Sequence, residues 1–102
     1  MDLEQQKTRI IEESETTLFF SNELNEIIFI ILEDLEQYEK EINFDLFKEY
    51  LTSAIEMCFD DRVQWLIIKE YSTIENLNKI DFDQIEKEFF NDIKNCFDIV
   101  GV

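Results

Sequence analysis

The sequence predicts an all-α fold, and three observations support this prediction. The 102 residues include no proline and a single glycine, whereas β-sandwiches and barrels need frequent Gly and Pro turns. Apolar residues recur at the three- and four-residue spacing that is typical of amphipathic helices. Residues that cap helices, such as Ser21, Asn43 and Asp81, stand directly before these apolar stripes. We therefore expect residues 1–102 to form a single domain, a compact bundle of four to five helices.

The first helix is predicted to run from about Leu3 to Phe20. Asp2 and Gln5 have the spacing of a capping box, in which an acid before the first turn is followed by an amide three residues later. One face of the segment carries a stripe that we expect to be buried: Leu3, Ile10, Ile11, Ser14 and Leu18.

The second helix is predicted from about Glu23 to Lys40, with either residue of the Ser21–Asn22 pair as its cap. Phe29, Ile30 and Leu32 widen the apolar stripe until little of the middle of this helix is polar. Such a helix is usually the most buried one of its bundle. The positions that follow the helical period are Leu24, Ile27, Ile28, Ile31, Leu35 and Tyr38.

Cap residues also mark the third and the last predicted helix. Asn43 precedes the third, which covers roughly Phe44–Phe59. The last helix begins at Asp81, with Gln84 at the capping-box spacing, and Gly101 stands where a helix ends.

The fourth helix, roughly Arg62–Leu77, is less clearly marked. Asp61 and Gln64 have the capping spacing, but the apolar opening Val63–Ile68 is also compatible with a buried strand. With a helix here, helices two and three and helices four and five would form two hairpins, preceded by the first helix. Similar segments at Ile42–Asp45 and Ile80–Asp83 are compatible with an internal repeat of such hairpins.

Charge is the most unusual property of the chain. It has 25 Asp and Glu against nine Lys and Arg, which gives a formal net charge of −16. A chain this acidic is repelled by nucleic acids and by anionic membrane surfaces, so we expect no direct contact with either. The longest apolar run, Ile27–Leu32, is too short to cross a bilayer, and the N-terminus does not resemble a secretory signal. These features predict a cytoplasmic protein.

The composition argues against an enzyme. The chain has no histidine, and its only glycine is Gly101, which removes imidazole chemistry and Gly-rich phosphate loops. Cys58 and Cys96 lie singly on apolar helix faces, so we expect buried thiols and no metal ligands. We therefore predict no cofactor and no metal. Carboxylates three residues apart, as in Glu12–Glu15 and Glu33–Glu36, leave a dimetal hydrolase as the weakest alternative.

The candidate functional residues are acids at two ends of the predicted bundle, together with one tryptophan. The turn between the second and third helices brings acids to one tip, and the turn before the fourth helix places acids at the opposite end. Trp65 lies off the apolar stripe of its helix and is a candidate interface anchor. The alternative buries Trp65, because Ile68 lies on the same side. The predicted contact residues are Glu33, Glu36, Glu39, Glu41, Asp45, Asp60, Asp61 and Trp65.

Together these features indicate an acidic inhibitor of a basic protein, such as a toxin or nuclease domain. An immunity protein or antitoxin against a nuclease-type toxin fits a compact chain with clustered charge. A phage-type nucleic-acid mimic that inhibits a host defence nuclease is the second variant. A helical adaptor or homo-oligomer without inhibitory role is the third interpretation, with Phe19, Phe20, Phe29 and Ile30 as a face for self-association.

Overall fold

The computed structural model describes residues 1–57, 61–72 and 81–102, and these ranges confirm the all-α prediction. They contain five α-helices, one π-helical turn and no strand. In chain order the elements are α1 (Leu3–Thr17), α2 (Asn22–Asp34), the π-helical turn η1 (Leu35–Glu39), α3 (Phe44–Met57), α4 (Arg62–Tyr71) and α5 (Phe82–Val100).

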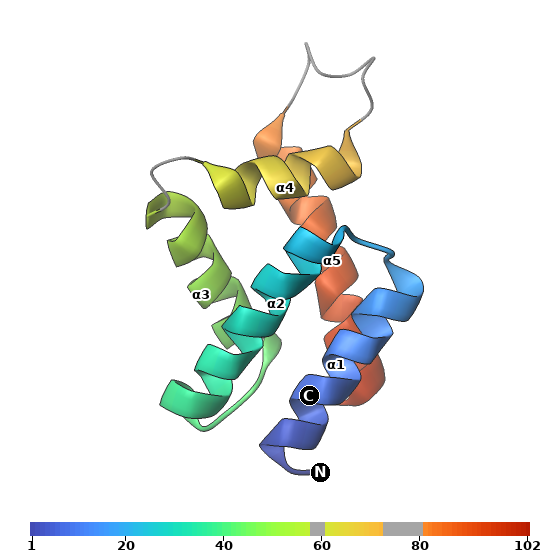
Figure 1. Cartoon of the computed structure of the whole chain (residues 1–102), viewed down its shortest axis with the longest axis vertical. Helices are drawn as coiled ribbons and strands as arrows, with labels where there is room; N and C mark the ends of the chain where they lie inside the picture. The colour runs from blue at the N-terminus through green and yellow to red at the C-terminus, as the bar shows by residue number, and fades with distance from the viewer. Residues whose placement is uncertain (58–60, 73–80) are drawn as a thin grey trace.

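Four helices form an upright bundle, and the fifth crosses one end of it (Figure 1). α1 contacts both α2 and α5, and α2 continues through η1 into a hairpin with α3. α4 lies across the upper end in this view, where it contacts α2, α3 and α5. α2 and α3 form the expected hairpin. α4 and α5, which were expected to pair in the same way, cross each other in the figure. Both chain termini lie toward the end opposite α4.

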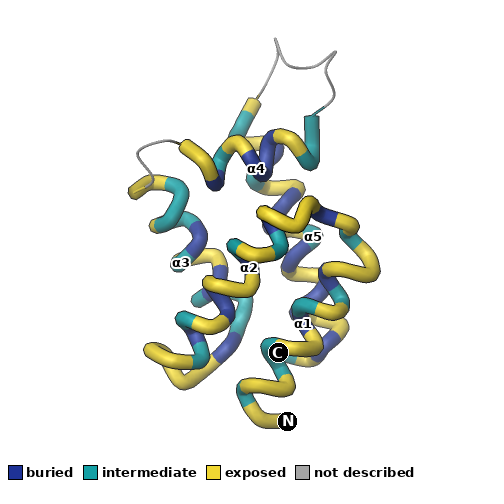
Figure 2. Tube along the Cα trace, in the orientation of Figure 1, coloured by how far each residue is buried: buried dark blue, intermediate teal, exposed yellow. Residues whose placement is uncertain are grey.

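The core is built from aliphatic side chains around a chain of aromatic rings. Figure 2 shows that buried residues line the sides of the helices that face one another. Phe97 is fully buried, and its ring centroid lies 5.5 Å from that of Phe47 and 5.9 Å from that of Phe44. Phe89 is likewise buried and lies 5.6 Å from Phe20. These contacts fasten α5 to α3 and to the segment that joins α1 and α2.

Most predicted caps are present. The Asp2 carboxylate accepts from Gln5 N at 2.8 Å, and the Gln5 side chain accepts from Asp2 N at 3.2 Å, which completes the capping box. Gly101 ends α5 in the left-handed conformation, with φ 91°. The other confirmed caps accept a backbone N–H three residues on: Ser21 from Leu24 at 3.2 Å, Asn43 from Leu46 at 2.9 Å and Asp81 from Gln84 at 3.4 Å.

The predicted cap at Asp61 is wrong. Asp61 precedes α4, but its backbone is left-handed, with φ 54°, and its side chain makes no capping hydrogen bond. The segment Val63–Ile68 is helical, so the strand alternative is also wrong. α4 ends at Tyr71, since Ser72 is extended. The last part of the predicted fourth helix, residues 73–77, and Cys58 near the predicted end of the third helix lie outside the described residues.

Helix two changes its geometry before it ends, which corrects its predicted stripe. Leu35 is fully buried, but the chain from Leu35 to Glu39 is a π-helix with wider turns. A wider turn rotates the next positions away from the core, so Tyr38 is 67% exposed instead of buried. Lys40 then ends the helix in the left-handed conformation, with φ 57°.

The all-round burial expected for the middle of helix two is also wrong. Leu32 is fully buried, whereas Phe29 and Ile30 are exposed. α1 is shorter than predicted, because Leu18 caps it and Phe19 takes a left-handed backbone with φ 54°. The chain therefore turns between α1 and α2 at Phe19, whose ring is exposed.

Candidate interaction surfaces

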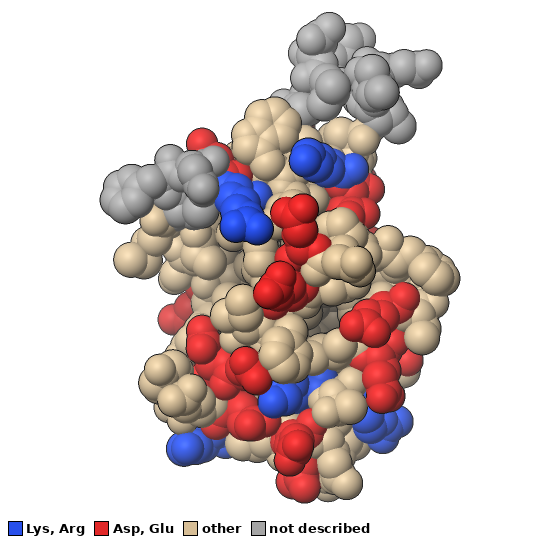
Figure 3. Space-filling model, in the orientation of Figure 1, with Lys and Arg blue, Asp and Glu red and all other residues tan. Residues whose placement is uncertain are grey.

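The structure gathers five of the eight predicted contact residues at one end of the α2–α3 hairpin. They come from α2, η1, the following loop and the first turn of α3: Glu33, Glu36, Glu39, Glu41 and Asp45, which we call the acidic tip. In Figure 3 acidic side chains lie around the lower end of the molecule, where this turn lies, interspersed with Lys and Arg, and further acids spread over the rest of this face. Asp61 and Trp65 lie on or next to α4, at the other end, and Asp60 lies outside the described residues.

Two acids of the tip are paired with a lysine from another helix. Lys7 of α1 places its Nζ 3.4 Å from Glu36 Oε2 and 3.9 Å from Glu33 Oε1. The lysine side chain is only 13% exposed, and its Nζ also lies 5.4 Å from the centre of the Phe29 ring. Glu36 and Glu33 therefore help to fasten α1 to the hairpin, a role that the sequence did not reveal.

A third acid of the tip is engaged by a tyrosine. The Tyr50 phenol donates a 2.7 Å hydrogen bond to Glu39 Oε1, which joins α3 to η1. This hydrogen bond, followed by burial and by the charges of Glu39, Asp34 and Glu49, raises the pKa of Tyr50 to about 12. Tyr50 therefore lies among the carboxylates of Glu39, Asp34 and Glu49.

The remaining members of the tip are the most available to a partner. Asp45 is exposed in the first turn of α3, where the helix dipole favours an acid. Glu41 is exposed and accepts a 3.0 Å hydrogen bond from the Asn43 amide, a contact between neighbouring exposed side chains. A basic partner would thus meet Asp45 and Glu41 first.

Trp65 projects from α4 with 50% of its surface exposed, so the buried alternative for this residue is wrong. Ile68, whose position suggested burial on that side, is itself buried. Asp61 and Arg62 are exposed at the start of the same helix, and Arg62 lies 3.6 Å from Glu23 of α2. The α4 end therefore carries mixed charge around an exposed indole, and it differs from the acidic tip.

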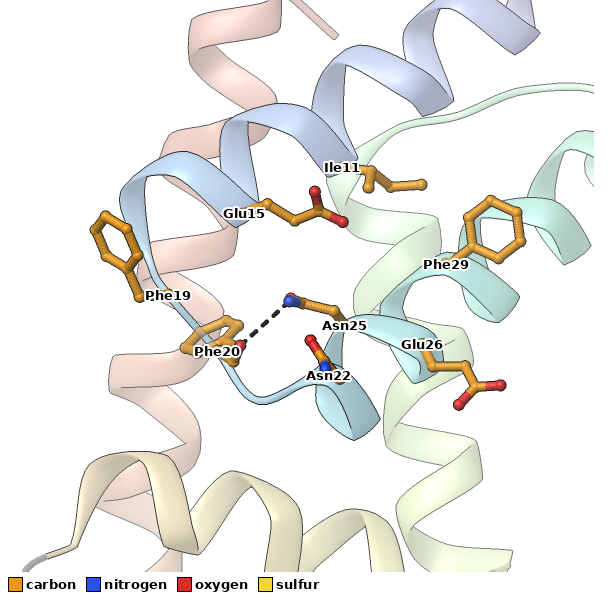
Figure 4. Close-up of a pocket in the computed structure, with 8 residues that line it drawn as sticks. All are labelled: Ile11, Glu15, Phe19, Phe20, Asn22, Asn25, Glu26 and Phe29. Carbon is orange, nitrogen blue, oxygen red and sulfur yellow. Dashed lines mark hydrogen bonds between the residues drawn. The ribbon is translucent and has the colours of Figure 1, made fainter.

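A groove of about 630 Å³ lies between α1 and α2, and no sequence motif marks it. Figure 4 shows the side chains around it, which come from both helices and from the turn that joins them. Its lining includes Glu15, Phe19, Phe20, Asn25, Glu26 and Phe29. The proposed apolar face Phe19, Phe20, Phe29 and Ile30 is not continuous, because Phe20 points into the core.

The turn beside the groove is held by hydrogen bonds from two helices. Asn25 Nδ2 of α2 donates to the Phe20 carbonyl at 3.2 Å, the dashed line in Figure 4. Ser21 N donates to Glu70 Oε1 of α4 at 2.6 Å. Both bonds engage the peptide group that joins Phe20 to Ser21, so they fix the backbone where the turn meets α2.

Two further titratable groups, Tyr71 and Cys96, have raised pKa values with structural explanations. Burial, followed by a 2.6 Å hydrogen bond to Asp92, raises the pKa of Tyr71 far above its ordinary value. Burial also raises the pKa of the Cys96 thiol, which lies 3.9 Å from Thr17 Oγ1. A raised pKa disfavours the reactive thiolate, in agreement with the expected core role of Cys96.

Two features are absent from the described part of the chain. Across residues 1–57, 61–72 and 81–102, no group of three or more Asp, Glu or Cys side chains is arranged to hold a metal ion. In the same ranges, no helix is both long and apolar enough to cross a bilayer.

Comparison of the chain with protein-family models, with curated proteins and with solved structures finds no match. The acidic tip, the α4 end and the groove between α1 and α2 are therefore the features from which a function can be inferred.

Proposed function

We propose that the chain is an acidic inhibitor that binds and neutralises a basic protein in the cytoplasm, without catalysis of its own. The single observation behind this proposal is the disposition of its charge. The net charge is −16, and every Asp and Glu in the described part of the chain is at least partly exposed. Such a surface repels itself and destabilises the compact state, and a strongly basic partner would relieve this repulsion.

The basic partner is most simply a nuclease-type toxin, with this chain as its immunity protein or antitoxin. Proteins that act on nucleic acids carry the clustered Lys and Arg that an acidic surface attracts. Long-range attraction accelerates encounter, which suits an inhibitor that must act before damage occurs. The acidic tip is the proposed first contact because its acids lie close together on one hairpin end.

A phage-type nucleic-acid mimic that blocks a defence nuclease is supported by the same charge and remains the second variant. The molecule is moderately elongated, with extents of 44, 28 and 21 Å. The two variants differ in the target, so identification of the partner separates them.

Self-association is supported by a different observation. Phe19 is 79% exposed, and Ile30, Phe29 and Trp65 add further exposed apolar surface. Sedimentation in high salt tests this adaptor or homo-oligomer function, because screening removes charge repulsion and leaves apolar contacts intact. A dimer in both high and low salt would favour it.

The proposal is tested by affinity capture with the tagged chain from native lysate at low and at moderate salt. We expect a basic protein that is lost progressively as salt rises, and whose nuclease or toxin activity falls when purified chain is added. Capture of the chain alone at both salt concentrations would overturn the inhibitor proposal and leave self-association.

A further inference from the structure

We propose that the groove between α1 and α2 binds an arginine side chain of the basic partner, together with the apolar residue next to it. The inference rests on the proposed function, because it names the segment of that partner which this groove would hold. It concerns a surface separate from the acidic tip, so the two can be tested independently.

The groove is already formed in the free chain. Phe20 is buried beside it and packs against Phe89 and Tyr71, with ring centroids 5.6 and 6.0 Å away. The bonds from Asn25 and Glu70 hold the backbone at Phe20 and Ser21. Binding to such a rigid surface loses little conformational entropy in the chain itself.

The groove has apolar surface for an aliphatic or aromatic group. Ile11 and Phe29 face the space from α1 and α2, and Phe19 stands at its edge in Figure 4. Phe19 is 79% exposed, so its ring is available to a partner. Lys7 Nζ already lies 5.4 Å from the centre of the Phe29 ring, so Phe19 is the ring left for a partner's guanidinium.

The groove also has hydrogen-bond acceptors but no basic side chain among its described lining residues. Glu15 comes from α1 and Glu26 from α2, and both are exposed. Within residues 1–57, 61–72 and 81–102, neither carboxylate has an ion pair or a hydrogen bond. Asn25 Oδ1 is buried and has no hydrogen-bond partner, although the same amide donates to the Phe20 carbonyl. This oxygen has almost no exposed surface, so the charged acceptors that a partner can reach are the two carboxylates.

Arginine fits this combination better than lysine does. A guanidinium has five N–H donors in a planar fork, which can bind a carboxylate with two parallel hydrogen bonds. It is weakly hydrated and stacks on aromatic rings, whereas an ammonium is compact and strongly hydrated. The apolar neighbour of the arginine would then cover Ile11 and Phe29.

The test is an NMR titration of the ¹⁵N-labelled chain with the tripeptide amide acetyl-Leu-Arg-Phe-NH₂. A second peptide carries citrulline, which is nearly isosteric with arginine but neutral. We expect the arginine peptide to shift amide signals of the groove, around Ile11, Phe20 and Asn25. The citrulline peptide and the variant Glu15→Gln/Glu26→Gln should each bind about tenfold more weakly. The control variant Glu56→Gln/Asp98→Asn removes the same charge from exposed sites outside the groove and should bind as the wild type does.

Three outcomes would overturn the inference: equal binding of both peptides, equal weakening by the control variant, or shifts confined to the acidic tip. Each would leave the proposed function standing, because capture of a basic protein is measured separately. Conversely, saturable groove binding with no basic protein captured would reject the proposed function, while showing that the groove recognises arginine.

Discussion

The phenol of Tyr50 donates a 2.7 Å hydrogen bond to the carboxylate of Glu39. Tyr50 belongs to α3 and Glu39 is the last residue of η1, so this bond joins the two sides of the hairpin at the acidic tip. Glu39 thus contributes a structural hydrogen bond to the acidic tip as well as a negative charge.

The Tyr50 contact predicts a stability change at high pH. The pKa of Tyr50 in the folded chain is about 12, above the ordinary tyrosine value of about 10. Because the folded value is the higher one, the stabilising contribution is complete below pH of about 10 and is lost as pH rises toward 12. Urea unfolding between pH 9 and pH 12, compared with Tyr50→Phe, checks this. Equal pH dependence of the two proteins would contradict it.

Replacement of Lys7 tests whether this lysine fastens α1 to the hairpin. Lys7→Met keeps the aliphatic stem but removes the cation 3.4 Å from the buried Oε2 of Glu36. We expect a loss of about 1–2 kcal/mol in the free energy of unfolding, because a shielded carboxylate loses its partner. Arg9→Met is the matched control, since Arg9 is exposed on the same helix and its loss changes the net charge equally. A similar loss in both variants would point to net charge instead.

The left-handed backbone at Phe19 predicts that glycine at this position gives a more stable chain than alanine does. Its φ of 54° is costly for a residue with a Cβ, and its exposed ring makes little packing to offset that cost. Phe19→Gly should therefore be more stable than Phe19→Ala by up to about 1 kcal/mol, as measured by thermal or urea unfolding. If the alanine variant is the more stable one, the backbone at this position is not left-handed in solution.

Repulsion among the many acidic side chains predicts that added salt stabilises the folded chain. At a net charge of −16, screening should favour the compact state more than it weakens the few exposed ion pairs. Between about 0.01 and 0.5 M NaCl we expect Tm to rise by about 4–8 °C, equivalent to roughly 1 kcal/mol. An unchanged Tm would mean that charge repulsion does not limit stability. Sucrose, which leaves charges unscreened, controls for general solute effects.

Local sequence signals predicted most of the fold. Caps at Asp2, Ser21, Asn43 and Asp81 depend on residues within three positions of each other, so the sequence contains the whole interaction. The π-helical turn could not be predicted in this way. Its effect is to rotate Tyr38 away from the core, whereas a regular period of apolar residues implies continuous α-helix.

The candidate site was only partly predictable. Position on the helical period placed Trp65 off the apolar stripe, and the structure exposes it. Hairpin topology brought the tip acids together. The pairing of Glu36 with Lys7, however, joins residues 29 positions apart, and nothing in the local pattern signals a contact between α1 and η1. The groove at Asn25 likewise depends on how α1 packs against α2.

The central claim, that charge at the acidic tip drives binding of a basic partner, calls for variants that keep the fold. The variant Glu41→Gln/Asp45→Asn neutralises the two most available tip acids and leaves Glu33, Glu36 and Glu39 in their contacts. Glu88→Gln/Asp98→Asn removes the same charge from exposed positions on α5.

The most direct measurement is the association rate of the captured basic partner with wild-type chain and both variants, as a function of salt. We expect the tip variant to associate about tenfold more slowly at low salt and to depend less on salt, because steering depends on the local field of the tip. The association rate of the control variant should fall much less. Equal rates for the two variants, or a wild-type rate that is independent of salt, would contradict the claim.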